Sequence, residues 1–411
     1  MISLIGRVYT AFNPQTVEKK SNAIRIGVLG AAKIAPLALI TPAKSHPEVI
    51  VQAVSARDQN RAKQFAKEYG IPDVKGSYQE LLDDPNIDAI FIPLPNGLHF
   101  EWAIRAIRAG KHVLVEKPSV SNAAEAKALF TMLELSQPNA PLLLEAFHHR
   151  FHPAIQLFRS FITSADVVHA YTDSMVPWVL TSKENIEFNY SLSGGSMMNL
   201  GTYNFGMLCI IFNDEPEECL KCDTSIFGDK LHDKCDYDFK AQFRFPGGGI
   251  GEATTSLRGP VLWKPSEARV TMCEVVIPDT SLPPTQEKIR TRQKTLHGFI
   301  HSFIWHRIDV NDSYVIRDTR NRQPLKSWVE SQSHKAYSFK EAGGHFANLP
   351  GEDWWMSYRY QLEEFVNGVK GRPTQYWVSA DDSIQQMRMI DMAYEKSGLG
   401  LRPTSSFLKE M

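Results

Sequence analysis

The sequence is poor in cysteine, has no long apolar run and carries almost no net charge, and each absence excludes a class of protein. Five cysteines among 411 residues form a sparse, odd-numbered set, which argues against a secreted disulfide framework and favours a reducing, cytoplasmic location. No apolar run approaches the roughly 18 to 20 residues that cross a bilayer. The 45 lysines and arginines nearly balance the 46 aspartates and glutamates, so the basic excess typical of nucleic-acid or membrane binding is missing. A small-molecule partner is therefore indicated.

The first 23 residues precede the first recognisable strand and are interpreted as an N-terminal extension. Residues 1–20 contain Arg7, several hydroxyl side chains and no acid before Glu18, which leaves an organelle-targeting segment open. Because a single arginine is a weak targeting signal, we expect a cytoplasmic protein.

From Ile24 onward, short apolar runs alternate with amphipathic segments, and the length of the chain favours two domains. The pattern predicts a doubly wound parallel sheet, a Rossmann domain over residues 24–149. An apolar stripe at i, i+3, i+4 and i+7 predicts a covering helix after the third strand. The stripe consists of Phe100, Ala103, Ile104 and Ile107. The predicted strands are 24–29, 49–55, 89–92, 113–115 and 142–144.

Beyond residue 150 the period changes. Residues 237–245 alternate apolar and polar side chains, which predicts a strand with one buried face, and Pro246 to Gly249 is typical of a hairpin turn. We therefore expect residues 150–411 to form an α+β domain with a large, mostly antiparallel open sheet. Residues 278–350 are polar and patchily periodic and are interpreted as loops and strands. Helices are expected over 360–369 and around an apolar face formed by Ile384, Met387, Ile390 and Tyr394.

The first strand runs into Gly30-Ala31-Ala32-Lys33-Ile34-Ala35, where a dinucleotide pyrophosphate would meet a helix N-terminus. Alanines replace the second and third glycines of the usual fingerprint, and a tight turn without a ligand is the alternative. The second strand ends in Ser55-Ala56-Arg57-Asp58. A hydroxyl and a guanidinium at this place suit the 2′-phosphate of NADP better than NAD. Asp58 is also a candidate N-cap of the next helix, and Arg61 a candidate solvated charge.

Two further motifs follow predicted strand ends, where ligands bind in such sheets: residues 93–99, with Leu94, Pro95, Asn96 and His99, and the Glu116-Lys117-Pro118 motif. The segment Gly110-Lys111-His112-Val113-Leu114-Val115-Glu116-Lys117-Pro118 resembles the most characteristic motif of the Gfo/Idh/MocA oxidoreductase family. The resemblance continues through residues 145–153 and 192–203, where it is most similar to the dihydrodiol and D-xylose dehydrogenase branch.

The resemblance implies NADP-linked hydride transfer at a sugar's anomeric carbon or at a vicinal diol, and a homodimer that associates through the open sheet. It places Lys117, Asn199 and Tyr203 at the catalytic centre, where Lys117 would favour ionisation of the Tyr203 phenol. The same three residues and Trp178 are the expected substrate contacts. The expected cofactor contacts are Gly30, Ala31, Ala32, Lys33, Ile34, Ser55, Arg57, Leu94, Pro95, Asn96, His99, Glu116 and Lys117.

Gly194-Gly195-Ser196 is typical of a loop and N-cap that open a helix, on which Asn199 and Tyr203, four residues apart, would share one face. The family usually has an aspartate where this chain has Asn199. A tyrosine-only mechanism, a slow enzyme and a nucleotide-binding regulatory protein without turnover are therefore all open.

Several other residues have two readings. His99 could touch the cofactor or cap its helix, and Trp178, Arg258 and Trp263 could line a sugar pocket or pack elsewhere. Two clusters resemble zinc ligand sets but are disfavoured. The first consists of His148, His149 and His152, of which His152 fits a hydrogen-bonded turn residue. The second consists of Cys219, Cys222, His232 and Cys235, and a three-residue separation within a strand would point Cys219 and Cys222 to opposite faces.

Overall fold

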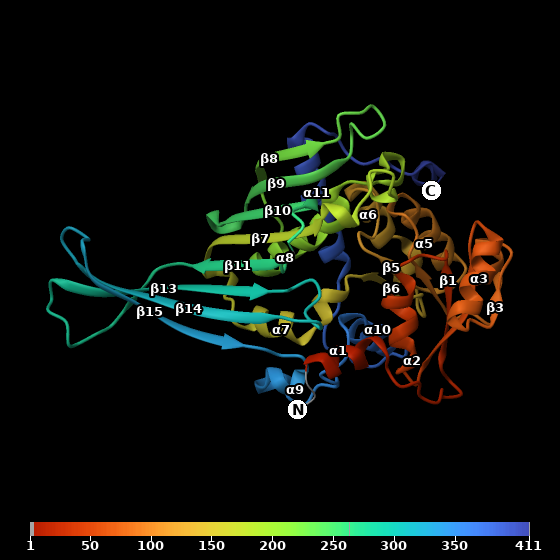
Figure 1. Cartoon of the computed structure of the whole chain (residues 1–411), viewed down its shortest axis with the longest axis horizontal. Coiled ribbons are helices and arrows are strands. Elements are labelled where there is room, and N and C mark those ends of the chain that lie inside the picture. The colour runs from red at the N-terminus through yellow and green to blue at the C-terminus, as the bar shows by residue number, and fades with distance from the viewer. Residues whose placement is uncertain (1–3, 263, 411) are drawn as a thin grey trace.

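The computed structural model describes residues 4–262 and 264–410. Among these residues, six strands form a parallel sheet in the order β3-β2-β1-β4-β5-β6, the strand order of a Rossmann domain (Figure 1). The predicted doubly wound sheet is confirmed, and only the short edge strand β3 was not foreseen. The strands are β1 Ile24–Leu29, β2 Val49–Ser55, β3 Asp73–Val74, β4 Ala89–Ile92, β5 His112–Glu116 and β6 Leu143–Ala146.

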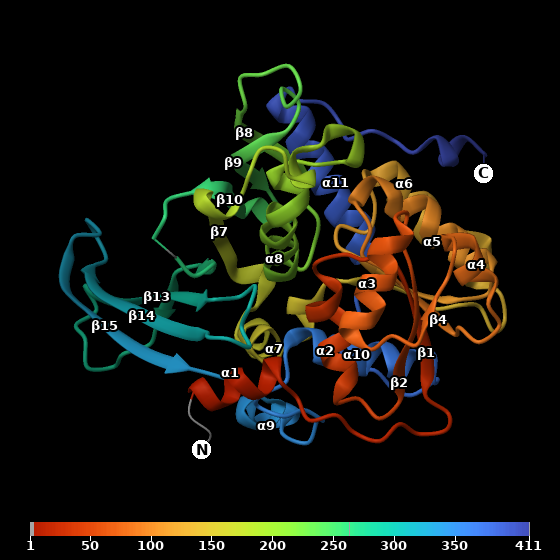
Figure 2. The same cartoon turned by 45° about the vertical axis from the view of Figure 1, so that its right-hand side comes forward.

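Helices pack around this sheet (Figure 2). The predicted covering helix is α5, whose apolar stripe is buried against β4 and β5. The helices of this part are α1 Leu4–Phe12, α2 Thr41–Lys44, α3 Gln59–Tyr69, α4 Tyr78–Asp83, α5 His99–Arg108 and α6 Ala123–Phe130.

In the described part of the second domain, nine strands form one sheet in the order β15-β14-β13-β11-β7-β10-β9-β8, with β12 paired to β13. Only β7 and β10 pair in parallel, so the expected mostly antiparallel sheet is confirmed. The predicted alternating strand is β9, and its hairpin turn leads into β10. The strands are β7 Val167–Pro177, β8 Glu218–Ile226, β9 Asp236–Arg244, β10 Ile250–Gly259, β11 Glu267–Met272, β12 Val275–Ile277, β13 Gln286–His297, β14 Arg307–Asp318 and β15 Pro324–His334.

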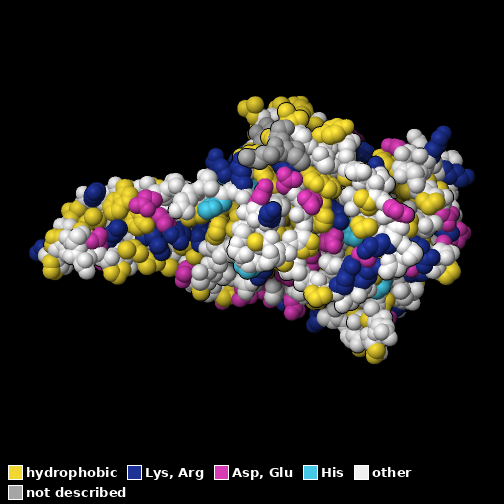
Figure 3. Space-filling view, turned by 90° about the horizontal axis from the view of Figure 1, so that it is seen from below, with side chains coloured by type: hydrophobic (Ala, Val, Ile, Leu, Met, Phe, Trp, Pro, Cys, Tyr) yellow, Lys and Arg dark blue, Asp and Glu magenta, His cyan; other side chains and the backbone are white. Residues whose placement is uncertain are grey.

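Strands β13, β14 and β15 form a long arm that projects from the molecule (Figures 1 and 3). It accounts for most of the region expected to hold loops and strands. Charged and aromatic side chains lie opposite one another on its strands, such as Arg290 opposite Tyr314 and Tyr314 opposite Trp328. Because the outer arm is covered on neither face, it lacks the two-residue apolar period that marks a half-buried strand.

Among the remaining helices, α11 contacts elements of both domains. The face of α11 that was predicted from Ile384, Met387, Ile390 and Tyr394 is buried, and this helix packs on α6, α8 and β8. The C-terminal segment therefore folds back onto the first domain. These helices are α7 Pro153–Ser160, α8 Thr202–Phe212, α9 Phe339–Ala342, α10 Ser357–Val369 and α11 Ala380–Ser397. No helix in the described ranges is long and apolar enough for a membrane span.

The N-terminal extension is packed along both domains. The Arg7 guanidinium in α1 donates to the backbone oxygens of Phe303 and Ile304, and lies 3.5 Å from the centroid of the Tyr337 ring. Farther along, Lys19 Nζ donates to the backbone oxygens of three residues at and beyond the end of α2, Ala43, Lys44 and His46.

Candidate active site

The turn after β1 has the geometry that a close approach of a ligand to the backbone requires. Gly30 has a φ of 96°, and a Cβ there would lie 3.0 Å from Leu94 Cδ2. The Gly30 amide donates to the Ser55 carbonyl oxygen at 2.6 Å, which holds the turn against the end of β2. Of the alanines that replace fingerprint glycines, Ala35 is buried and Ala32 half-buried. Ala31 is buried, Ile34 is half-buried and Lys33 is exposed.

The end of β2 carries an unpaired hydroxyl and two guanidinium groups. The Ser55 side chain is buried, and its Oγ has no hydrogen-bond partner among the described residues. Arg57 is exposed, whereas Arg61 Nη2 donates to the Ala31 carbonyl oxygen at 2.7 Å. Arg61 is exposed, as expected of a solvated charge, but its hydrogen bond also places the guanidinium beside the glycine turn. Asp58 is the N-cap of α3 and accepts from the amides of Asn60 and Arg61, as expected.

The loop after β4 is tied to its neighbours. Asn96 Nδ2 donates to the Ser193 carbonyl oxygen at 3.2 Å. The two ring nitrogens of His99 lie 2.7 Å from the Leu94 oxygen and 2.9 Å from the Pro118 oxygen. Burial lowers the pKa of His99 to about 4, whereas the two backbone carbonyl oxygens oppose that change, because only a protonated ring can donate to both of them. His99 thus links two loops of the site, and both of its nitrogens face backbone carbonyls.

Lys117, Asn199 and Tyr203 are brought together as the sequence predicted. Lys117 follows β5, and its Nζ donates to the Asn199 carbonyl oxygen at 2.9 Å. The same Nζ lies 4.9 Å from the centroid of the Tyr203 ring. Burial lowers the pKa of the Lys117 ammonium, and the carboxylates of Glu116 and Glu145 oppose that change.

The acid–base properties of Tyr203 differ from the sequence expectation. Lys117 lies beside the ring of Tyr203, and the hydroxyl is 2.9 Å from His148 Nε2. Burial raises the pKa of Tyr203 well above its usual value, and Tyr358 and Glu116 add to the shift. The pKa of Tyr203 is therefore raised where a lowering by Lys117 was expected, because burial disfavours the charged phenolate.

The sequence did not single out His148 as a neighbour of Tyr203. Its Nδ1 lies 2.8 Å from Ser357 Oγ at the start of α10, and its ring stacks on Tyr358 with centroids 3.9 Å apart. His301 stacks on it as well, at 5.9 Å. Two signals were available in the sequence: the three histidines within residues 145–153, which resemble a metal ligand set, and the family resemblance of that segment.

The other histidines of that segment have different surroundings. Both ring nitrogens of His149 are buried without a hydrogen-bond partner among the described residues, and its ring centroid lies 5.2 Å from that of Tyr203. His152 Nδ1 accepts from the Ala154 amide at 3.2 Å and caps α7, which confirms its reading as a hydrogen-bonded turn residue.

The helix that carries Tyr203 starts differently from the expectation. The Ser196 side chain makes no capping hydrogen bond and donates instead to the Asp236 carboxylate. Asp236 Oδ2 also accepts from the Met197 amide at 2.9 Å, so a carboxylate from β9 supplies the cap. A π-helical turn, Met197–Gly201, precedes α8 and changes the α-helical spacing on which the shared face of Asn199 and Tyr203 was based.

A buried carboxylate adjoins Lys117. Glu116 Oε2 accepts from the Lys117 amide at 3.3 Å, whereas Oε1 has no hydrogen-bond partner among the described residues. Burial raises the pKa of Glu116 to about 7. The carboxyl group therefore changes protonation near neutral pH.

The expectation for Cys219 and Cys222 is wrong in its geometry. A register shift in β8 pairs Cys219 with Phe243 and Cys222 with Ala241, so both cysteines are buried on the same face of the sheet. A β-bulge causes this, because an extra residue reverses the alternation of side chains. His232 Nδ1 is bonded to Asp229. Within 4–262 and 264–410, no group of three or more His, Cys, Asp or Glu side chains is arranged to hold a metal ion.

The expected pocket residues of the second domain are scattered. Trp178 follows β7 and is 50% exposed, and no recorded contact joins it to Lys117 or Tyr203 in the described part of the chain. The Arg258 guanidinium lies 5.4 Å from the centroid of the Phe227 ring. Trp263 lies outside the described residues.

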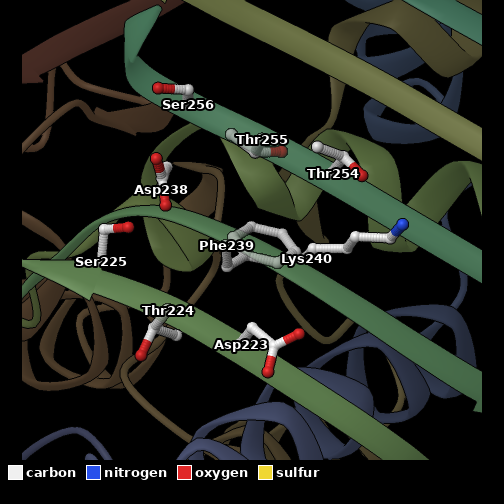
Figure 4. Close-up of a pocket in the computed structure, with 9 residues that line it drawn as sticks. All are labelled: Asp223, Thr224, Ser225, Asp238, Phe239, Lys240, Thr254, Thr255 and Ser256. Carbon is white, nitrogen blue, oxygen red and sulfur yellow. The ribbon is translucent and has the colours of Figure 1, made fainter.

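The open face of the second sheet is polar. A shallow pocket across β8, β9 and β10 is lined by hydroxyl and charged side chains, among them Asp223, Asp238 and Lys240 (Figure 4). On the neighbouring strands, His169 and Glu252 lie 3.5 Å apart. The homodimer expected at this face stays a prediction.

Comparison with known proteins agrees with this architecture. A family model described as "Oxidoreductase family, NAD-binding Rossmann fold" (GFO_IDH_MocA) matches residues 24–138. D-xylose 1-dehydrogenase (NADP(+)) 2 from Haloferax volcanii is 38% identical over 178 residues, 43% of this chain and 54% of that protein. The aligned part thus spans about half of that relative.

A second relative is covered more fully. Trans-1,2-dihydrobenzene-1,2-diol dehydrogenase from Sus scrofa is 31% identical over 244 residues, 57% of this chain and 68% of that protein. Among solved structures, a 3-ketoreductase from Actinomadura kijaniata in complex with NADP and TDP-benzene superposes with a TM-score of 0.63. It is 20% identical, with 91% of this chain and 98% of that chain covered, and it shows the shared fold. The chain belongs to the Gfo/Idh/MocA oxidoreductase family.

Proposed function

We propose that this protein is an NADP(H)-dependent oxidoreductase that transfers a hydride between nicotinamide and a CH–OH carbon. The proposed substrate is an aldose such as xylose, oxidised at its anomeric carbon, or a vicinal diol. The observation that carries the proposal is the meeting of Lys117 and Tyr203, from a strand end and a helix of different domains, with Nζ 4.9 Å from the ring centroid. The relatives named as D-xylose and dihydrodiol dehydrogenases support this substrate class.

The residues at the first domain's strand ends fit a dinucleotide. Gly30 provides the turn with positive φ, and the unpaired, buried Ser55 hydroxyl has free hydrogen-bonding capacity. Arg57 and Arg61 would supply positive charge for a 2′-phosphate, which favours NADP over NAD. When bound, the nicotinamide supplies the hydride acceptor or donor. The NADP-dependent relative supports the same choice.

The chain's own groups would handle the substrate hydroxyl. The Lys117 ammonium, held by the Asn199 carbonyl oxygen, can donate a further hydrogen bond to a substrate oxygen. The Tyr203 hydroxyl is the expected proton-transferring group. The Asn199 side chain can orient a hydroxyl but cannot take its proton, so position 199 lacks the carboxylate that the family resemblance leads one to expect there.

The test is formation of reduced nicotinamide, followed by absorbance, with NADP or NAD and a panel of aldoses and vicinal diols. We expect turnover with NADP and at least one substrate, and its loss in Lys117→Ala. Binding of NADP without turnover of any panel member would contradict the proposal and favour the nucleotide-binding regulatory protein, the alternative that Asn199 raises.

A further inference from the structure

His148 is the hydrogen-bond partner that the described residues provide for the Tyr203 hydroxyl. Nε2 lies 2.9 Å from Tyr203 Oη, and Nδ1 lies 2.8 Å from Ser357 Oγ. The three side chains come from α8, from the turn after β6 and from the start of α10. They form a continuous hydrogen-bonded chain that leads away from the proposed hydride-transfer centre.

We propose that His148 is a proton relay behind Tyr203, taking the proton that Tyr203 passes on when a substrate hydroxyl is oxidised. The inference rests on the proposed function and deepens it. It assigns to His148 a role that the Lys117–Tyr203 pair alone does not include.

The surroundings of His148 keep the imidazole neutral and able to accept a proton. Burial lowers its pKa well below the usual value, and neighbouring cationic or ionisable groups add to the effect. A neutral imidazole carries one N–H group, and the relay requires the tautomer in which Nδ1–H donates to Ser357 Oγ, so that Nε2 accepts from the Tyr203 hydroxyl. With the opposite tautomer Nε2 would donate to Tyr203 and could not take its proton. The titratable or charged groups that face His148 are His301, His149, Lys117, His152, Tyr203 and Tyr358.

The relay explains how Tyr203 can act as a base although it is protonated at neutral pH. Burial raises the pKa of Tyr203, so the phenolate that could act alone as a base is scarce at neutral pH. A phenol whose proton is directed at His148 still has an oxygen lone pair for the substrate hydroxyl. Loss of the hydride makes that hydroxyl strongly acidic, and a weakly basic imidazole is then sufficient.

The step balances with oxidised nicotinamide dinucleotide as the oxidant. The substrate C–H bond breaks and its electron pair leaves with the hydride, while the substrate O–H electrons form the C=O bond. The hydroxyl proton bonds to Tyr203 Oη as the original Tyr203 proton bonds to His148 Nε2. The products are a carbonyl compound, reduced nicotinamide, neutral Tyr203 and a His148 imidazolium, whose Nδ1–H faces the Ser357 hydroxyl.

The kinetic test is His148→Phe, which keeps a ring but cannot take a proton, compared with wild type from acid to alkaline pH. We expect the rate of substrate oxidation by the variant to be roughly 10- to 100-fold below wild type near pH 7. The rate of the variant should rise with pH, because without His148 the Tyr203 hydroxyl must ionise before it can act as the base. In mixtures of light and heavy water, a plot of the rate against the deuterium fraction of the solvent should be curved for wild type, because two protons move in one step. The same plot should be linear for the variant, in which one proton moves.

The matched control is His149→Phe, because His149 is equally buried and contacts the Tyr203 ring but makes no recorded hydrogen bond. Its pH profile should keep the wild-type shape. A wild-type profile in His148→Phe, or the same change in both variants, would overturn the relay and leave the proposed function intact. A wild-type protein without turnover would overturn the proposed function and the relay with it.

A second readout needs no turnover. Side-chain nitrogen NMR of the cofactor-free protein should show a neutral His148 at neutral pH, with an Nε2 resonance that moves in Tyr203→Phe. An Nε2 resonance unchanged by that substitution, or a His148 ring already charged at neutral pH, would overturn the relay.

Discussion

Replacing Tyr203 by phenylalanine removes one hydroxyl and leaves the packing of the ring in place. The ring contacts Phe147 and His149, with centroids 5.5 and 5.2 Å away, and Lys117 Nζ lies 4.9 Å from its centroid. What is lost is the hydrogen bond to His148 and the group expected to transfer the substrate proton. The variant should therefore fold and bind NADP but turn over slowly.

The magnitudes follow from those contacts. A buried His148 nitrogen left without its partner should lower the free energy of unfolding by about 1 to 3 kcal/mol. Loss of a general acid–base group should lower turnover by roughly 10² to 10⁴. No recorded contact joins Tyr203 to Gly30 or Ser55 among the described residues, so NADP affinity should be nearly unchanged.

The assay combines a steady-state rate with NADP and the best substrate, and NADP affinity from quenching of protein fluorescence. Lys117→Ala should be at least as damaging, and the double variant little worse than either single one, because residues that act as a unit are not additive. If Tyr203→Phe turns over at a near-normal rate, Tyr203 is not the acid–base group and the mechanism is wrong.

Four further predictions concern the cofactor, the buried carboxyl group, the amide and the assembly. Arg57→Glu should weaken NADP binding by about 2 to 3 kcal/mol and spare NAD in titrations of both, and an equal loss for both would rule out its assigned role. Burial raises the pKa of Glu116 from 4.5 to about 7, so its protonated form adds stability that is lost as pH rises through that range. In chemical denaturation, the free energy of unfolding of Glu116→Gln minus that of wild type should be up to about 3 kcal/mol larger at pH 8 than at pH 5. A difference that does not change with pH would refute this. Asn199→Asp should preserve or raise the steady-state turnover, and a large fall would show that the amide is required. Sedimentation should show a homodimer through the open sheet, and a monomer at micromolar concentration would contradict this.

The periodicity of the sequence was sufficient to predict the local elements of this fold. Buried parallel strands are near-continuous apolar runs, so β1, β2 and β4 were predicted at their observed bounds. The family resemblance likewise implied that Lys117, at the end of a strand, would lie near Tyr203, and the two side chains do meet. The arm was only partly foreseen, because strands covered on neither face carry no apolar alternation.

Tertiary packing decided the chemistry of the site. The hydrogen bond of Tyr203 joins it to a residue 55 positions away, and the cap of its helix comes from Asp236 on another strand. Neither contact leaves a local pattern in the chain. The pKa of Tyr203 depends on how completely its hydroxyl is desolvated, which is a property of the whole cluster around it. The sequence by itself thus determined that Lys117 and Tyr203 would meet, and the three-dimensional surroundings determined their other partners and how each holds its proton.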